Sequence, residues 1–270
     1  MPDGVICVLG DAHLDVVVTV SAPIAPDTDT AARTRVTPGG QAANVAAWVA
    51  ALGGGSRLIS ARADDAAGML VTSDLAGRGV DVVGPVLAGN TGVVVSLSDG
   101  GSQRSMLTDR GVGPLLSAAA IDSRWLDGCS WLHLPVYSLT SDPVREAALA
   151  AAEAARRRAA KLSVDLSSTA AITSYGPPAL TALLAALEPD LVFGTEAEVD
   201  LIGQVPRATM ITKLGADGVL VGGTRYSAIR TEPVDATGAG DAFAAGYLVG
   251  GVHDGLAAAA RAVATIGAMP

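Results

Sequence analysis

The segment Val234–Phe243 reads Val-Asp-Ala-Thr-Gly-Ala-Gly-Asp-Ala-Phe, and the fold can be inferred from it. The tripeptide Gly238–Gly240 has almost no side chains, so a loop here can turn tightly and direct consecutive backbone N–H groups at one point. The alanine-rich run 242–249 predicts a helix, whose positive N-terminal end would make those N–H groups an anion-binding site. Asp241 would lie at the last loop position or in the first helical turn.

This segment alone does not establish a function. A carboxylate such as Asp241 is a good helix cap, and a single Gly-x-Gly-Asp is often only a turn. The anion-binding interpretation therefore needs a second site that fits the same chemistry.

Such a site occurs near the other end of the chain. The segment Pro38–Ala46 reads Pro-Gly-Gly-Gln-Ala-Ala-Asn-Val-Ala, a glycine-led entry into a helix with Asn44 in its first turns. In this order the two segments resemble the paired signatures of the ribokinase-like (PfkB) family of sugar and nucleoside kinases. Those signatures are Gly-Gly followed by Asn, and Asp-Thr-x-Gly-Ala-Gly-Asp, here with Ala236 in place of the usual Thr. The resemblance implies a three-layer α-β-α sandwich with a mainly parallel central sheet and a small β-sheet lid.

Length and composition agree with one large α/β domain over residues 1–270. Half of the residues are apolar but only 3% are aromatic, so the core must be built from Ala, Val and Leu. The net charge of −9 argues against a nucleic-acid surface, which needs clustered Lys and Arg. An acidic protein can still bind ATP, because the local field of a helix N-terminus and Mg²⁺ decides that contact.

The cellular location is expected to be the cytoplasm. Cys7 and Cys129 lie in apolar, strand-like surroundings and are interpreted as buried small residues in a reducing compartment rather than a disulfide. No segment has the pattern of a signal peptide, and no apolar run is long enough to span a bilayer. We expect a soluble protein that binds neither membranes nor nucleic acid.

The first predicted strand is the apolar run Val5–Gly10. Asp11, His13 and Asp15 follow at its carboxyl end, the edge where open α/β sheets bind ligands. Taken alone, two acids here are most simply a solvated turn. The resemblance implies that Asp15 accepts hydrogen bonds from substrate hydroxyls, with Asp11 and His13 as weaker candidates for the same pocket.

Four further β-prone segments do not alternate with helices. They are Val16–Val20, Thr34–Val36, Thr91–Ser98 and Arg104–Thr108, and Asp99–Ser102 predicts a hairpin turn between the last two. Such strands would form a separate small sheet, which the resemblance identifies as the lid over the substrate, at about residues 14–38 and 90–110. Relatives often form homodimers through this lid.

The remainder of the chain predicts alternating helices and strands, which indicates a parallel sheet with right-handed crossovers. Helices are expected over 41–52, 68–78, 143–161, 178–186 and 255–268, and strands over 58–60, 131–135, 162–166, 191–193 and 210–213. The basic run 156–158 is interpreted as a solvated helix face. The stretch 62–65 resembles the family's Gly-Asp-Asp stretch.

The resemblance assigns roles for phosphoryl transfer, which needs a positioned donor, neutralised charge and a base for the attacking hydroxyl. Asp241 would be the general base. The amides of Gly238, Ala239, Gly240 and Asp241 would stabilise charge on the moving group. Gly39, Gly40 and Asn44 would hold the acceptor, and lid closure would exclude water.

The nucleotide and metal sites follow from the same resemblance. Thr195 aligns with the family's Asn and Glu198 with its Glu, which arranges the water shell of Mg²⁺; Glu196 is an alternative. Lys213 is expected near the phosphates, although a lysine at a strand end could equally be exposed. The expected nucleotide-binding residues are Lys213, Gly215, Gly218, Thr237, Gly238 and Gly240, and the tail 255–268, which includes Arg261, would flank the adenine.

Two other nucleotide-binding classes are excluded by motif. The chain contains no Gly-x-x-x-x-Gly-Lys-Ser/Thr, and no Gly-x-Gly-x-x-Gly follows the first strand. Asp235 and Thr237 match positions that hold a monovalent cation such as K⁺ in some relatives. The expected cofactors are therefore ATP and Mg²⁺, with K⁺ as an option.

The acceptor is the least determined feature. None of Trp48, Trp125, Trp131 or Tyr137 lies in the predicted lid strands, which favours a sugar or sugar acid over a nucleoside whose base stacks on an aromatic lid residue. Arg104 and Arg110 could meet an acidic substrate or only solvate the lid. A nucleoside such as adenosine or pseudouridine stays open, as does a non-catalytic ligand-binding relative, which only the substitutions at Ala236 and Thr195 support.

Overall fold

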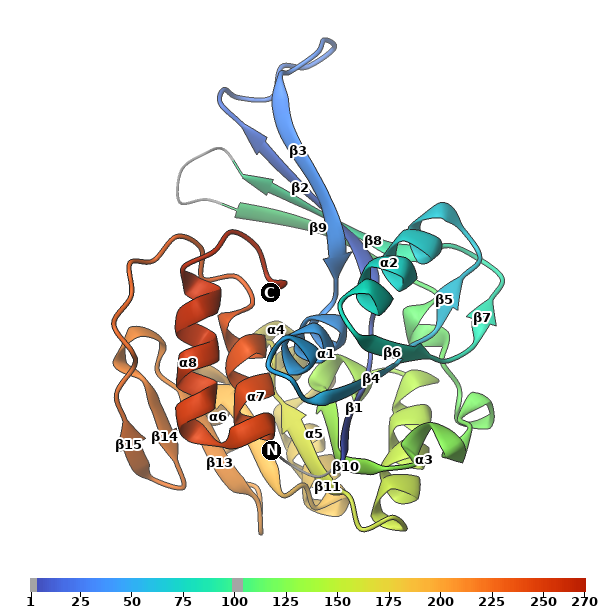
Figure 1. The fold of residues 1–270 in the computed structure, drawn as a ribbon, viewed down its shortest axis with the longest axis vertical. Helices are drawn as coiled ribbons and strands as arrows, with labels where there is room; N and C mark the ends of the chain where they lie inside the picture. The colour runs from blue at the N-terminus through green and yellow to red at the C-terminus, as the bar shows by residue number, and fades with distance from the viewer. Residues whose placement is uncertain (1–3, 99–103) are drawn as a thin grey trace.

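A computed structural model describes residues 4–98 and 104–270 of the chain. Within these residues the protein is a three-layer sandwich of helices, a nine-stranded sheet and helices, with a small four-stranded sheet projecting beyond it (Figure 1). The expected three-layer α-β-α architecture is therefore confirmed. The hairpin turn predicted at Asp99–Ser102 lies outside the described residues.

The large sheet has the order β15-β14-β13-β12-β11-β10-β1-β4-β6, and all neighbours from β13 to β6 pair in parallel. Only β14 and β15 add antiparallel at one edge. The strands are β1 (Val5–Leu9), β4 (Gly55–Ile59), β6 (Val80–Val83), β10 (Cys129–Pro135), β11 (Lys161–Asp165), β12 (Leu191–Thr195), β13 (Thr209–Lys213), β14 (Val219–Val221) and β15 (Thr224–Tyr226).

The two faces of this sheet bury separate cores, because alternate side chains of a strand point to opposite faces. In β1, Ile6 and Val8 pack with helices α1 (Gln41–Ala51), α2 (Ala66–Gly77), α7 (Ala239–Gly250) and α8 (Val252–Val263). Cys7 and Leu9 pack toward α3 (Val144–Arg156), α4 (Thr169–Tyr175), α5 (Pro177–Leu187) and α6 (Glu196–Ile202). The buried faces of both helical layers contain many alanines, whose small side chains let the helices pack close to the sheet. This agrees with the core of Ala, Val and Leu expected from the composition.

The small sheet has the order β3-β2-β8-β9. Its strands are β2 (His13–Val20), β3 (Ala32–Gly39), β8 (Thr91–Ser98) and β9 (Arg104–Gly111), and the central pair β2–β8 is parallel. The expected separate sheet is present, and β2 and β3 begin and end close to the carboxyl edge of β1. A further short pair, β5 (Arg62–Ala63) and β7 (Val86–Leu87), lies beside α2.

Several predicted boundaries were wrong, each for a local reason. The helix expected to run to Lys161 ends at Arg156, because residues 157–160 turn with Ala159 at φ 58° before β11. Helix α7 starts at Ala239, three residues before the predicted run, and α8 ends at Val263 rather than at residue 268. Helices α4 and α6 and the hairpin β14–β15 were not predicted at all.

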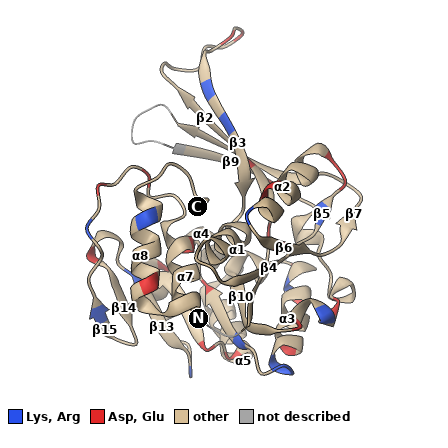
Figure 2. Cartoon of the chain, viewed as in Figure 1, with Lys and Arg blue, Asp and Glu red and all other residues tan. Residues whose placement is uncertain are grey.

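The arginines 156–158 are not simply a solvated face. Arg156 donates to the carbonyls of Leu187 and Glu188 at the end of α5, and Arg158 pairs with Asp127 at 2.8 Å. Arg157 pairs with Glu153 one turn earlier. Over the drawn elements basic and acidic residues are interleaved (Figure 2), so no basic stripe for nucleic acid is seen in this view.

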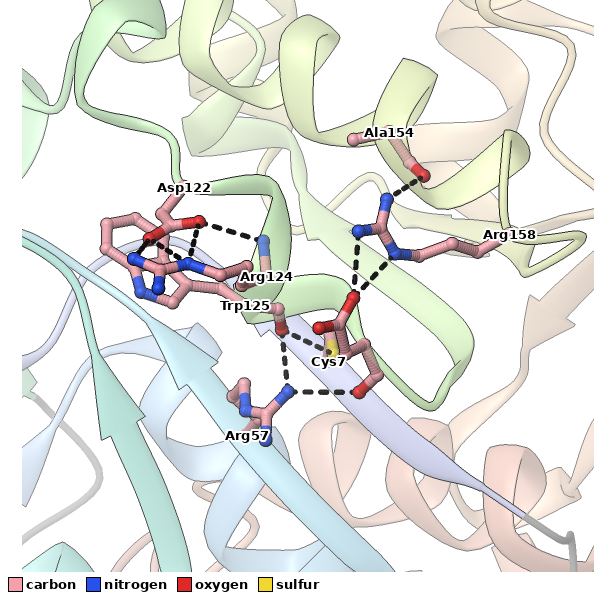
Figure 3. Close-up of polar contacts among 8 residues, drawn as sticks. Cys7, Arg57, Asp122, Arg124, Trp125, Ala154 and Arg158 are labelled. Atoms are coloured by element: carbon pink, nitrogen blue, oxygen red, sulfur yellow. Dashed lines mark hydrogen bonds and ion pairs between the residues drawn. The ribbon is translucent and has the colours of Figure 1, made fainter.

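The edge of the sheet opposite the carboxyl ends is held by a polar network (Figure 3). Arg57 of β4 donates to the carbonyls of Trp125 at 2.8 Å and Asp127 at 3.2 Å, and pairs with Asp81. These contacts fasten the 3₁₀ turn Ser123–Leu126 to the sheet. Cys7 and Cys129 are both free thiols here, as expected.

Membrane-spanning segments were sought within the described residues. No single helix there is long and apolar enough to cross a bilayer, and only the joined pair α4 and α5, bent by 94°, passes by length and composition.

Candidate active site

Two cavities meet at the N-terminus of α7. The first has a volume of about 710 Å³ and lies between the small sheet and the carboxyl edge of the large sheet. The second, about 560 Å³, lies between α7, α8 and the segment 228–233. Lys213 and Gly240 line both cavities, and we call the place that they define the junction.

The start of α7 presents free amides at this junction. Gly238 precedes the helix at φ 76°, and a Cβ there would lie 2.6 Å from the Cα of Ala268, so only glycine fits. Among the described residues, neither Gly240 nor Asp241 donates its amide to a backbone carbonyl, whereas Ala242 already donates to Gly238 at 2.9 Å. The N–H groups of the first turn are therefore available to an anion.

The two sequence motifs converge on Asp241. Asn44 Nδ2 in α1 donates to Asp241 Oδ2 at 2.8 Å, and both residues line the first cavity. Loss of solvent raises the pKa of Asp241 to about 7, and the negative charge of Asp165 acts in the same direction. Hydrogen bonds from Asn44 and Gln41 and the charge of Lys213 oppose that rise. A carboxylate with this pKa is suited to accept a proton near neutral pH.

Lys213 lies at the junction, not in solvent. Its Nζ donates to both carboxylate oxygens of Asp165, at 2.8 and 3.1 Å, and a Cβ placed on Gly240 would be only 3.4 Å from it. Burial disfavours the ammonium, but the charge and hydrogen bonds of Asp165 outweigh it, so the pKa of Lys213 is raised. The cation is thus permanent beside the free amides.

Gly40 lines the first cavity, and Gly39 lies against the side chain of Asp15, which also lines it. A Cβ on Gly39 would lie 2.2 Å from the carboxylate carbon of Asp15, and one on Gly40 would lie 2.4 Å from the carbonyl oxygen of Asp11. Asp15 faces the cavity, and its Oδ1 lies 3.0 Å from His13 Nδ1. The glycines therefore let the Asp15 carboxylate rest directly against the β3–α1 turn.

Asp11 is already paired within the protein. Both of its carboxylate oxygens accept from Arg110 of β9, at 2.6 and 3.1 Å, and Arg110 also donates to the carbonyl of Tyr137 at 3.2 Å. The guanidinium carbon lies 5.8 Å from the ring centre of Tyr137. The ion pair joins the small sheet to the end of β1. In it, the charges of Arg110 and Asp11 neutralise each other. Arg104 begins β9.

Glu198 and Thr195 form the first turn of α6. Thr195 Oγ1 accepts from the Glu198 amide at 3.4 Å, and Glu198 Oε2 accepts from the Thr195 amide at 2.8 Å, a capping box. Glu198 is buried and lines the first cavity, whereas Glu196 is exposed and does not. Of the two expected carboxylates, only Glu198 faces the site.

Asp235 fastens the loop before α7. Its Oδ1 accepts from the amide and hydroxyl of Thr237, at 2.9 and 2.6 Å, and its Oδ2 accepts from the Gly267 amide at 2.9 Å. Both carboxylate oxygens therefore accept hydrogen bonds from the chain and hold the loop before α7 against Gly267.

The second cavity is lined by four of the residues expected to bind the nucleotide, Lys213, Gly215, Gly218 and Gly240. Gly215 and Gly218 open it after β13, and Phe243, Leu256 and Val263 give it an apolar wall. It lies beside α8, where the tail was expected to flank the adenine. Arg261 does not line it but lies over the ring of Trp48, 5.3 Å from the ring centre.

Sequence reasoning missed several residues that line the first cavity. Asp165 ends β11 and is fully buried, and Gln41 opens α1 beside Asp241. Tyr137 also lines it, although it lies in a 3₁₀ turn after β10 rather than in the small sheet. The available signal was position: Asp165 and Tyr137 follow strands whose carboxyl ends share the edge used by β1.

Comparisons with known proteins give the family. The chain matches the family model described as pfkB family carbohydrate kinase over residues 4–269. It is 31% identical to the ATP-dependent ribose-1-phosphate kinase of Halopiger xanaduensis, over 92% of this chain and 86% of that protein. It is 31% identical to a fructokinase of Escherichia coli, over 92% of this chain and 85% of that protein. It is 29% identical to the aminoimidazole riboside kinase of Salmonella typhimurium, over 78% and 72%.

Solved structures share the fold. The adenosine kinase of Sinorhizobium meliloti superposes with a TM-score of 0.86 at 23% identity, covering 100% of this chain and 96% of that one. The ribokinase II candidate of Escherichia coli, solved with ATP and Mg²⁺, superposes with a TM-score of 0.82 at 22% identity, covering 98% and 94%. The chain therefore belongs to the PfkB family of carbohydrate kinases, phosphotransferases that act on hydroxyl groups.

Proposed function

We propose that this protein transfers the γ-phosphoryl group of ATP to a hydroxyl of a small neutral sugar, with Asp241 as general base. One observation carries the proposal: Asp241 lines the first cavity next to Gly240, which lines both cavities, and its pKa is raised to about 7. A base at that place can take a proton from a hydroxyl in the first cavity while a phosphoryl donor occupies the second.

The residues around Asp241 orient and support this step. The hydrogen bond from Asn44 would orient the Asp241 carboxylate toward a hydroxyl in the first cavity. The free amides of Gly240 and Asp241 and the ammonium of Lys213 lie together at the junction. They would oppose the negative charge on the group in transit.

Mg²⁺ fits this chain only as an ion bound mainly by substrate. Within the part of the chain that the structure describes, no cluster of three or more His, Cys, Asp or Glu side chains could hold a metal. Glu198, buried and facing the first cavity, would order waters around the ion. When bound, Mg²⁺ would supply positive charge that offsets the negative charge of the phosphates.

The charges of the first cavity favour a neutral acceptor. Its basic side chains each lie within ion-pair distance of a carboxylate: His13 with Asp15, Arg110 with Asp11, and Lys213 with Asp165. The remaining acids, Asp241 and Glu198, form no ion pair with a basic side chain among the described residues, although the charge of Lys213 acts on both. A carboxylate or phosphate on the acceptor would thus enter an acidic cavity, so we narrow the expected sugar or sugar acid to an uncharged sugar.

The small sheet would act as the lid of this cavity. Val94 of β8 and Met106 and Thr108 of β9 line it, opposite the end of β11. Closing these strands onto a bound sugar would exclude water, which otherwise competes as phosphoryl acceptor.

A nucleoside is the second candidate for the acceptor. Tyr137 and Met106 give the first cavity an aromatic and a polarisable apolar side chain, and its volume of about 710 Å³ exceeds the need of a single sugar ring. The named activity of the Salmonella relative, on aminoimidazole riboside, points the same way.

We extend the proposal to a homodimer through the outer face of the small sheet. Val36, Val16, Val95 and Leu107 are paired in register across the four strands, on the face opposite Asp15. Val36 is 49% exposed and Leu107 60% exposed, so the row is open to a partner. A second copy offers the same row by symmetry.

The deciding experiment is an ADP-release assay with a panel of acceptors. It compares neutral sugars, nucleosides, sugar acids and sugar phosphates, including ribose against ribose 1-phosphate because of the name of the Halopiger relative. Turnover of a neutral sugar at least about tenfold faster in kcat/KM than its charged counterpart is expected. Tight acceptor binding without ADP release would favour a non-catalytic relative, and Asp241→Asn with wild-type turnover would remove Asp241 from the mechanism.

A further inference from the structure

We infer that Asp165 is a positioning residue: it tethers the ammonium of Lys213 at the junction, where that ammonium meets the phosphoryl group in transit. The inference rests on the proposed function and assigns a task to two residues of the same site. Asp165 itself would touch neither substrate.

The contact between Lys213 and Asp165 reaches across one strand of the large sheet. Lys213 ends β13 and Asp165 ends β11, and β12 lies between them. The long lysine side chain therefore crosses the end of β12 to reach a carboxylate that is fully buried. Ser167 also donates its amide to Asp165 Oδ1 at 2.9 Å, which helps to fix the carboxylate. The acceptor of the tether is thus held by its own backbone.

The ammonium retains a donor for a ligand. Lysine has three N–H donors, and the two contacts with Asp165 use at most two of them. Nζ lies beside Gly240, where a Cβ would be 3.4 Å from it. Lys213 and the free amides of the first turn of α7 therefore surround one small volume that opens into both cavities.

A purely structural ion pair is the simpler alternative, and its position argues against it. Burying two charges costs several kcal/mol in desolvation, so a pair with only a structural task is readily replaced by apolar residues. This pair lies at the only described place where the two cavities share lining residues. Positioning a cation for phosphoryl transfer explains why the charges are retained there.

The pair also acts on Asp241, with opposite signs. The negative charge of Asp165 raises the pKa of Asp241, and the positive charge of Lys213 lowers it. Other groups face this cluster: Asn44 and Gln41 from α1 donate to Asp241. Glu198 from α6 and His133 from β10 complete the surroundings; His133 is buried and its pKa is lowered to about 4, so it is uncharged at neutral pH.

The test compares Asp165→Asn and Lys213→Met with two controls. Lys161→Met changes the other lysine of the chain, which is exposed on β11, and Asp200→Asn changes an exposed acid on α6. We expect Lys213→Met to lower kcat by about 100-fold and Asp165→Asn by about tenfold, with both controls near wild type. Lys213→Arg should restore part of the loss.

The pH profile separates positioning from plain support of the fold. Without the negative charge of Asp165 the pKa of Asp241 falls, so the acid limb of kcat/KM moves to lower pH. Without the positive charge of Lys213 that pKa rises, so the limb moves to higher pH. An Asp165→Asn enzyme with wild-type kcat and an unshifted acid limb would overturn the inference.

A binding measurement keeps this test independent of turnover. Calorimetry should show that Lys213→Met binds a non-hydrolysable ATP analogue at least about tenfold more weakly while adenosine binding is unchanged, because only the analogue carries phosphates. Carbon-13 NMR titration of the Asp241 carboxyl gives the two pKa shifts directly. If the wild type turns over no acceptor, the proposed function fails, but these two measurements can still be made. If Asp165→Asn does not fold, unchanged binding of the analogue by Lys213→Met would still overturn the inference, because the ammonium that Asp165 holds would then not meet phosphate.

Discussion

Asn44 Nδ2 donates to Asp241 Oδ2 at 2.8 Å, joining two helix starts that lie 197 residues apart in the sequence. Asn44 comes from the Gly-Gly entry into α1, and Asp241 comes from the Gly-Ala-Gly entry into α7. The contact therefore ties the floor of the acceptor cavity to the base proposed for the chemical step.

Replacement of Asn44 by Ala should change the pH dependence and not only the rate. The hydrogen bond from Asn44 favours ionised Asp241, so its loss raises the pKa of Asp241 above about 7. We expect kcat/KM at pH 7 to fall about tenfold or more, with a smaller deficit at pH 9. Asn90→Ala, at an exposed site in a loop, is the matched control. An equal deficit at every pH would contradict this account of Asn44.

Asp241→Asn should stabilise the protein at alkaline pH. The folded-state pKa of about 7 lies above that of an unfolded aspartate near 4, so the folded protein holds this proton more tightly. Stability from this group is therefore complete below about pH 4 and is lost as the pH rises through about 7. Removing the carboxylate should raise the free energy of unfolding at pH 8 by on the order of 1–3 kcal/mol.

Urea denaturation of the wild type and Asp241→Asn at pH 5 and pH 8 measures this effect. The gain of the variant should be larger at pH 8 than at pH 5. A gain that does not depend on pH would show that Asp241 is not held at a raised pKa.

Gly39→Ala should damage acceptor binding and leave the nucleotide cavity intact. The new Cβ would lie 2.2 Å from the carboxylate carbon of Asp15, so that side chain must move. We expect KM for the acceptor to rise about tenfold or more while binding of the ATP analogue stays within twofold. Gly77→Ala is the matched control, because a Cβ there meets nothing within 4 Å. Weakened nucleotide binding in Gly39→Ala would show that the change is not local.

The fold class and the meeting of Asn44 with Asp241 could be predicted because the resemblance to the family rests on two short motifs in the sequence. Glycine-led helix starts and apolar strands can be recognised from neighbouring residues, and these features identified Asn44 and Asp241. Element ends were less predictable: α3 stops at Arg156 because Ala159 adopts a positive φ, which no local pattern requires. The residues missed from the site depend on contacts between distant strands.

Asp165 shows why such residues escape local reasoning. It is one acid after a buried strand, and its importance arises only because β13 places Lys213 two strands away and 48 residues later. Arg110 is a second example. From the sequence, Arg110 was expected to contact either an acidic substrate or solvent. In the fold it forms an ion pair with Asp11.

The outer face of the small sheet gives a prediction about assembly. Leu107 lies in register with Val95 of β8, which lies in register with Val16 of β2, and Leu107 is 60% exposed. Leu107→Lys would place a charge in this apolar row, so a dimer formed through it should dissociate. Light scattering after size-exclusion chromatography should show a dimer for the wild type and a monomer for the variant.

Leu149→Lys provides the control for this prediction, because Leu149 is a partly exposed leucine on α3, far from the small sheet in the fold. That variant should stay dimeric. If the small sheet is also the lid, loss of the dimer should raise the KM for the acceptor more than the KM for ATP, because β8 and β9 line only the first cavity. A monomeric wild type would show that there is no such dimer. A Leu107→Lys protein that stays dimeric would show that the interface lies elsewhere.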